Sequence, residues 1–261
     1  MRINPLPLAL IGVLAAGPAF AATTVPLDFS GQSFDSVTRV ITFVDILGDG
    51  TADLVMAPID GPSSFVSGND SRNEDSLGQL GQVNFAETTD RLTTDFRFTF
   101  VETGTSNVLD PGGDVEIGVL DLDFFGRESI TLLSPAKVTV ADSTLITQDV
   151  DPIDNNARFL GASVFDVANS GLSNGSGSLN AAQEQVAISI NFGQVSSFDL
   201  RFSVLDGTEQ NSRNFFLDGE VVFDDTIPDV IFNSIPLPAP ALLLLTGFGA
   251  IVMLGGARRR A

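Results

Sequence analysis

Residues 94–102 read Thr-Asp-Phe-Arg-Phe-Thr-Phe-Val-Glu, and this stretch decides the fold class. Every second residue from Phe96 to Phe100 is phenylalanine, and the residues between them are polar. Successive side chains of a β-strand point to opposite faces, so this period of two predicts a strand with one buried and one solvated face.

The same alternation recurs later in the chain, at 185–192 and 198–204. Further apolar segments bounded by turn residues are expected to be strands as well. They are 25–30, 37–44, 52–56, 115–123, 129–133, 137–141, 159–167 and 215–223. The polar stretches 61–82 and 169–182, rich in Gly, Ser and Asn, are expected to be loops. About eleven strands without a convincing amphipathic helix predict an all-β domain over residues 22–234: an antiparallel β-sandwich of two packed sheets.

The composition excludes several classes of function. Cys, His, Trp and Tyr are absent, which removes histidine triads, thiol nucleophiles, Cys/His zinc sites and disulfides. Apart from four arginines in the terminal segments, the chain has nine basic and 33 acidic residues, a formal charge of −24. A surface of that charge repels phosphate backbones, so a nucleic-acid partner is not expected.

The first 21 residues have the pattern of a secretory signal peptide. A positive start at Arg2 precedes an apolar run, and the small-residue exit Ala19-Phe20-Ala21 predicts cleavage after Ala21. An uncleaved membrane anchor is the alternative, but the run contains Pro7 and Gly12 and is short for a span. The segment implies export through the Sec translocon.

The other end of the chain, 235–261, combines an apolar stretch, a cluster of arginines and a proline motif. Residues 241–257 are uncharged and long enough to cross a bilayer as a minimal helix. Arg258, Arg259 and Arg260 follow and are expected to stay on the cytoplasmic side as a stop signal. A buried core helix is the alternative, although it would bring three arginines against the core.

Immediately before this apolar stretch stands a proline motif of five residues. They are Ile235, Pro236, Leu237, Pro238 and Ala239. Together with the signal peptide, the apolar stretch and the arginine cluster, this motif resembles the VPLPA-CTERM variant of the PEP-CTERM class, with isoleucine in place of the first valine. The resemblance covers about the last 27 residues, and it implies that an exosortase, a membrane-embedded sorting enzyme, reads the tail in a bacterium that secretes exopolysaccharide. Because prolines lack a backbone N–H and stop a helix, the motif is expected to be extended at the membrane surface.

The body pattern loosely resembles the Asp-rich jelly-roll domains of exported PEP-CTERM-type proteins. That likeness rests on strand pattern and acidic composition, with no fixed motif. It implies a jelly-roll-like arrangement of the strands.

One loop has a spacing suited to a cation. Residues 45–54 resemble the calcium loops of FG-GAP and dockerin-type repeats, with Asp45, Asp49 and Asp53 as candidate oxygen ligands for Ca²⁺. Leu47 occupies a position where those loops have Asp or Asn. The alternative is a plain β-turn at 48–50, which is a common use of such residues.

A second group of acids also suggests either an ion site or a solvated strand face. Asp121 and Asp123 lie two apart on an expected strand, with Glu116 on its other face and Glu128 further along. Paired carboxylates could also hydrolyse a glycosidic bond. Among 33 acids such pairs arise by chance, and phenylalanine is the only aromatic residue for a sugar platform.

These observations favour a non-enzymatic protein. We expect a protein exported across the inner membrane, transiently anchored by its C-terminal helix, and then released to the cell surface or extracellular matrix. The alternative is a calcium-dependent module that binds the cell's own exopolysaccharide, and a carboxylate-based glycosidase is third.

Overall fold

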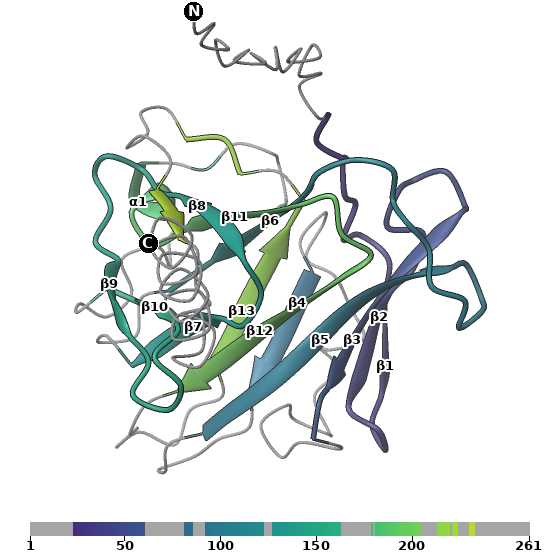
Figure 1. The fold of residues 1–261 in the computed structure, drawn as a ribbon, viewed down its shortest axis with the longest axis horizontal. Helices are drawn as coiled ribbons and strands as arrows, with labels where there is room; N and C mark the ends of the chain where they lie inside the picture. The colour runs from purple at the N-terminus through teal and green to yellow at the C-terminus, as the bar shows by residue number, and fades with distance from the viewer. Residues whose placement is uncertain are drawn as a thin grey trace, which may run out of the picture.

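The computed structural model describes residues 23–60, 81–85, 92–122, 127–162, 179, 181–204, 213–219, 221–223 and 230–232. Within them lie fourteen strands and one short helix, α1 (Ala181–Glu184). All strand pairings between these elements are antiparallel, and they form two sheets (Figure 1). The all-β prediction is confirmed.

The larger sheet has eight strands. In spatial order they are β1 (Gln32–Asp35), β2 (Val40–Phe43), β3 (Ala52–Pro58), β5 (Leu92–Glu102), β12 (Ser197–Val204), β7 (Glu128–Leu132), β10 (Ala157–Leu160) and β9 (Thr147–Val150). The alternating stretch at residues 94–102 forms most of β5, near the centre of this sheet. It pairs with β12, the other strongly alternating segment, so that Phe98 lies opposite Phe198.

The smaller sheet has six strands. In spatial order they are β14 (Val230–Phe232), β8 (Ala136–Thr139), β11 (Ile188–Gly193), β6 (Val115–Leu120), β13 (Arg213–Asp218) and β4 (Gly81–Phe85). From β5 to β8 the chain alternates between the two sheets, and it does so again from β10 to β13. Within these two stretches, consecutive strands therefore lie in different sheets.

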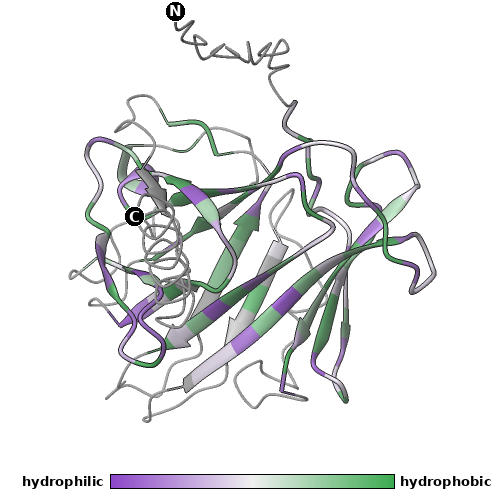
Figure 2. Ribbon diagram, viewed as in Figure 1, coloured by the Kyte–Doolittle hydropathy of each residue, from purple (hydrophilic) through white to green (hydrophobic). Residues whose placement is uncertain are grey.

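The inner faces of both sheets meet in one hydrophobic core, which makes the domain a β-sandwich. Phe198 of β12 stacks on Phe98 in its own sheet and on Phe192 of β11 in the other, with ring centroids 4.8 Å and 4.0 Å apart. Phe202 meets Phe215 edge to face across the same gap at 5.2 Å. Green and purple bands alternate along β5 and β12 (Figure 2). Each of these strands therefore places its apolar residues in the core and its polar residues on the outer face.

Some strand expectations were wrong. Residues 25–30 are not a strand; the preceding residue, Thr24, makes an isolated bridge to Asp114. The expected strand 37–44 is shorter, because residues 36–39 form a turn between β1 and β2. Strand β6 ends at Leu120 and β13 at Asp218, and β4 begins inside the expected loop 61–82. Strands β1, β4, β9 and β14 were not among the expected strands.

The N-terminal segment is nevertheless held tightly against the body. Val25 N–H donates to Asp114 O at 2.9 Å, and Asp114 N–H donates to Thr23 O at 3.0 Å. A Cβ at Gly113 would lie 2.4 Å from Thr23 O, and one at Gly219 would lie 1.9 Å from Leu27 O. Only glycine permits backbones to approach so closely, so these two glycines allow residues 23–27 to pack against the body.

Candidate functional site

The loop predicted to bind calcium is a tight connection between β2 and β3. Its backbone is closed by Ile46 N–H donating to Ala52 O at 2.9 Å and by Gly48 N–H donating to Asp45 O at 2.8 Å. The structure therefore brings Asp45 and Asp53 to the base of one hairpin loop and places Asp49 at its tip.

The three carboxylates of this loop accept hydrogen bonds from the protein itself. Asp53 is 6% exposed, and its two oxygens accept the N–H groups of Asp45 at 2.9 Å and Gly104 at 3.0 Å. Asp45 Oδ1 accepts Gly50 N–H at 2.5 Å. Asp53 thus joins the 45–53 loop to the neighbouring loop at Gly104, which is a structural use of a buried carboxylate.

At the tip of the loop, Asp49 Oδ1 accepts both the hydroxyl and the N–H of Thr51, at 2.6 Å and 3.0 Å. These two bonds, the hydroxyl first, lower the pKa of the Asp49 carboxyl. Within the described residues, no group of three or more His, Cys, Asp or Glu side chains is placed to hold a metal ion. The hydrogen bonds favour the turn, and calcium binding at Asp45, Asp49 and Asp53 stays a prediction.

A comparison of salts distinguishes the two uses of the loop. Because the body carries a large negative charge, any salt should raise its melting temperature by screening. If the loop is only a turn, CaCl₂ should stabilise the protein no more than MgCl₂ at equal concentration or NaCl at matched ionic strength, and D49N should respond as wild type does. An increment specific to Ca²⁺ that D49N abolishes would instead establish a calcium site.

Of the second acidic group, the structure describes Asp121, Glu116 and Glu128. Asp121 lies beyond the end of β6 with φ of 68°, a left-handed conformation that breaks the alternation of the strand. Glu116 lies on the six-stranded sheet and Glu128 on the eight-stranded sheet. Asp123 is outside the described residues.

The most concentrated polar cluster in the described structure was missed by sequence reasoning. Arg201 of β12 is 8% exposed and lies on the outer face of the eight-stranded sheet. Its Nε and Nη2 donate to the two carboxylate oxygens of Asp95 on β5, at 2.6 Å and 2.9 Å. Its Nη1 donates to Asp151 at 3.2 Å and to Asp154 at 2.8 Å.

The β9–β10 loop supplies the last two carboxylates and folds over the outer face of the sheet. Asp151, which is fully buried, also accepts the Thr131 hydroxyl of β7 at 2.8 Å and the Ile153 N–H at 2.9 Å. One guanidinium therefore joins β12, β5 and this loop. We call Arg201, Asp95, Asp151 and Asp154 the arginine clamp.

The contacts within the arginine clamp shift the pKa values of Asp151 and Arg201. Burial by itself raises the pKa of the Asp151 carboxyl, but hydrogen bonds from Ile153, Thr131 and Arg201 outweigh burial and leave that pKa below its ordinary value. The pKa of Arg201 is raised, chiefly by its hydrogen bonds to Asp95. Asp151 and Arg201 are thus both held ionised at neutral pH.

Two further arginines on the same sheet make two-pronged pairs with aspartates of neighbouring strands. Arg97 Nε and Nη2 each lie 2.8 Å from Asp199, and Arg158 Nε lies 2.8 Å from Asp149. The period of two already placed Arg97 and Arg201 on the polar face. The strand register, which decides their partners, had no signal in the sequence.

A polar row also crosses the outer face of the six-stranded sheet. Asn191 of β11 lies between Lys137 of β8 and Glu116 of β6, directly opposite both in register. Its Nδ2 donates to Glu116 Oε2 at 3.3 Å, and Ser189 Oγ donates to Glu116 Oε1 at 2.5 Å.

The sorting motif at 235–239, the arginines at 258–260 and the signal peptide lie outside the described residues. In the part of the chain that the structure describes, no helix is long and apolar enough to cross a membrane. No protein-family model matches the chain, and no curated protein matches it.

Proposed function

We propose that this chain is an exported surface or extracellular-matrix protein with a non-catalytic, acidic β-sandwich whose tail is processed by an exosortase. The observation that carries the proposal is the order of segments at the C-terminus: Ile235-Pro236-Leu237-Pro238-Ala239, an uncharged stretch, then three arginines. The signal peptide supplies the export route through the Sec translocon and leaves the body outside the inner membrane.

The position of β14 supports this reading of the tail. The last described strand ends at Phe232, and only Asn233 and Ser234 separate it from the motif. Eight residues, 233–240, connect β14 to the expected membrane helix, and fully extended they reach at most about 28 Å. A folded body would thus stand close to the membrane, with the motif extended between them as a protease substrate must be.

Three carboxyl groups of the body are unsuited to act as the general acid of a glycosidase. The carboxyl groups of Asp35, Asp49 and Asp151 have lowered pKa values, each held down by hydrogen bonds. A glycosidase needs one carboxyl with a raised pKa as its general acid. The aspartates of the arginine clamp instead serve to hold strands and a loop together.

The packing of the aromatic residues argues in the same direction. Every phenylalanine whose side chain is described is buried or half-buried. These residues therefore provide no flat, outward-facing aromatic platform for a sugar ring. Their burial disfavours the exopolysaccharide-binding alternative. The finer topology that we propose is jelly-roll-like, because the chain alternates between the sheets from β5 to β8 and from β10 to β13.

Mass spectrometry of the mature protein from its native cells tests the proposal. We expect residues after about Ala239 to be missing, because the apolar stretch is the part removed. Replacing Pro236 and Pro238 by alanine should let the helix extend through the motif and leave full-length precursor in the membrane. Pro228→Ala, outside the motif, is the matched control and should be processed normally. An intact tail on all of the mature protein in a strain with active exosortase would overturn the proposal.

A further inference from the structure

We propose that Lys137 and Asn191 form an intramolecular isopeptide bond, with Glu116 transferring protons. The three side chains lie on the outer face of the six-stranded sheet, on three adjacent strands and in direct register. Directly opposed residues of neighbouring strands have Cβ atoms about 5 Å apart, so the lysine stem can bring its amine to the asparagine carboxamide. The reaction adds a covalent link to the fold and is independent of how the tail is processed.

The Asn191 carboxamide is held in one orientation by both of its polar atoms. Its Oδ1 accepts the Gly193 N–H at 2.8 Å, at the irregularity that ends the β11–β6 pairing, while its Nδ2 donates to Glu116 at 3.3 Å. A donor already on the carbonyl oxygen stabilises the negative charge that develops there when an amine attacks. The departing nitrogen lies beside the carboxylate that can protonate it.

Glu116 is itself fixed for this role. Its second oxygen accepts the hydroxyl of Ser189, which is 2% exposed and lies two residues before Asn191 on the same strand. The carboxylate is thus aimed along β11 at the carboxamide.

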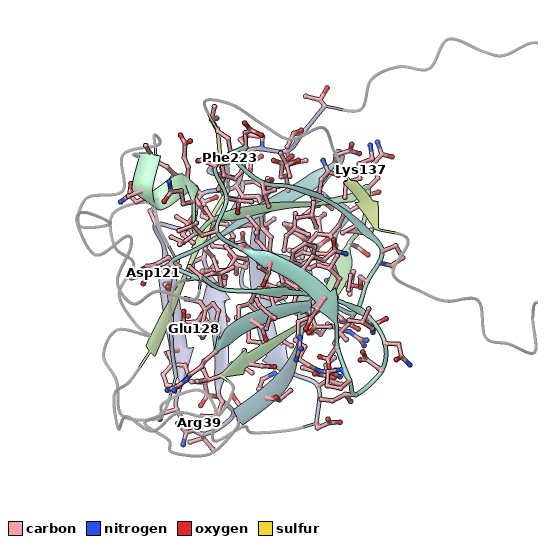
Figure 3. All side chains as sticks on the ribbon, turned by 90° about the vertical axis from the view of Figure 1, so that its left-hand side faces the viewer. Arg39, Asp121, Glu128, Lys137 and Phe223 are labelled. Atoms are coloured by element: carbon pink, nitrogen blue, oxygen red, sulfur yellow. The ribbon has the colours of Figure 1, made fainter. Side chains whose placement is uncertain are left out.

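Lys137 lies on the opposite side of Asn191 and is exposed at the periphery of the molecule, one strand in from the edge strand β14 (Figure 3). It is the one lysine among the 261 residues. Among the residues that the structure describes, Arg97, Arg158 and Arg201 are in ion pairs with aspartates, whereas Lys137 is in none. Within the described residues, no ion pair of Lys137 has to break before its amine attacks.

The step balances without a co-reactant. The Lys137 ammonium first releases a proton to solvent, and the resulting amine attacks Cγ of Asn191 to give a tetrahedral intermediate, whose oxyanion the Gly193 N–H stabilises. Glu116 accepts a proton from the attacking nitrogen and delivers it to the Asn191 Nδ2, which departs as ammonia. The C–N bond of the carboxamide breaks, a new amide between Lys137 Nζ and Asn191 Cγ forms, and no atom is oxidised or reduced.

Such a bond would tie β8 to β11 and close a loop through residues 138–190. A covalent link that closes a long loop stabilises a protein by restricting its unfolded state, as disulfides do. This chain has no cysteine and cannot form a disulfide. An amide cross-link would supply the same kind of covalent restraint after export.

Two measurements on the full chain or its mature form test the proposal. The intact mass should be lower than the mass calculated for its sequence by one ammonia, and tandem spectra should show the Lys137 and Asn191 peptides joined. Because Lys137 is the chain's one lysine, a lysine-specific endoproteinase should leave the denatured, linked protein uncut. The unlinked chain would give two fragments.

Matched variants separate the roles of the three residues. K137R and N191A should show the full mass for their sequences, and E116Q should form the bond at least about a hundredfold more slowly. The control is E102Q, because Glu102 also accepts an asparagine amide, from Asn107 at 2.9 Å, without a lysine opposite; it should cross-link normally. Wild type of full mass that is cut once at Lys137, or E116Q that links at the wild-type rate, would overturn the proposal.

Discussion

Replacing Arg201 by methionine is expected to lower the free energy of unfolding by about 3 to 5 kcal/mol. The guanidinium is 8% exposed and compensates three carboxylates, of which Asp151 is fully buried. Methionine retains most of the apolar volume and removes the charge, so Asp151 would remain ionised in the interior without its partner.

Chemical denaturation of R201M and of the matched variant R97M measures this effect. Arg97 makes an equally short pair with Asp199, but its side chain is 56% exposed. Solvent screens that pair, and its loss should change stability by no more than about 1 kcal/mol. The double variant R201M/D151N should recover part of the loss, because it removes the charge left unpaired. Equal effects of R201M and R97M would show that the arginine clamp contributes little.

Acid titration of stability gives a second, independent measurement of the clamp. The pKa of Asp151 is lower in the folded than in the unfolded protein, so its contribution is complete above the ordinary carboxyl pKa, about 4. It is lost as the pH falls through the folded-state value. In R201M the folded-state pKa should rise, and the acid-dependent loss attributable to Asp151 should shrink relative to wild type. An unchanged acid profile in R201M would show that Arg201 does not hold Asp151 ionised.

Truncating Phe98 to alanine should cost about 3 to 5 kcal/mol. The ring is fully buried, stacks on Phe198 at a centroid distance of 4.8 Å, and contacts the aromatic group that links the two sheets. Its removal takes away apolar burial and leaves a cavity that a sheet cannot collapse easily. Ile190, equally buried on the opposite sheet, should lose roughly 2 to 5 kcal/mol in the same change.

Val108→Ala is the control for both core variants, because Val108 is 63% exposed and should change stability by no more than about 0.5 kcal/mol. The measurement is again the free energy of unfolding from denaturation curves. A loss below about 1 kcal/mol for F98A would mean that β5 does not lie at the centre of the sandwich.

The long alternating strands could be predicted from the sequence, whereas several of the short ones could not. Strands β5 and β12 each place several phenylalanines on one face, so period two alone shows which side chains are buried. Strands β1, β9 and β14 have three or four residues each, too few for a period to be seen. They form because they hydrogen-bond to the backbone of a neighbouring strand. That pairing depends on residues elsewhere in the chain and not on the sequence of the short strand itself.

The candidate sites also differ in how far the sequence could predict them. The acidic loop at 45–53 is contiguous, so its residues could be named in advance, although only the structure shows Asp53 accepting the N–H of Gly104 from a different loop. The clamp draws Asp95, Asp151 and Arg201 from three distant segments. Spacing along the chain has no relation to such a cluster.

The sequence by itself therefore determined the all-β class, the faces of the main strands, and the absence of cysteine and histidine chemistry, and it predicts the segments proposed for export and sorting. Those conclusions depend only on composition and on patterns within a few residues, which local geometry translates directly into structure. The tertiary structure alone decided which strands pair and in what register. It thereby brought Arg201 to its three aspartates and aligned Lys137, Asn191 and Glu116 across three strands. Register is set by the packing of the whole core, so contacts between strands far apart in sequence exist only once that core has formed.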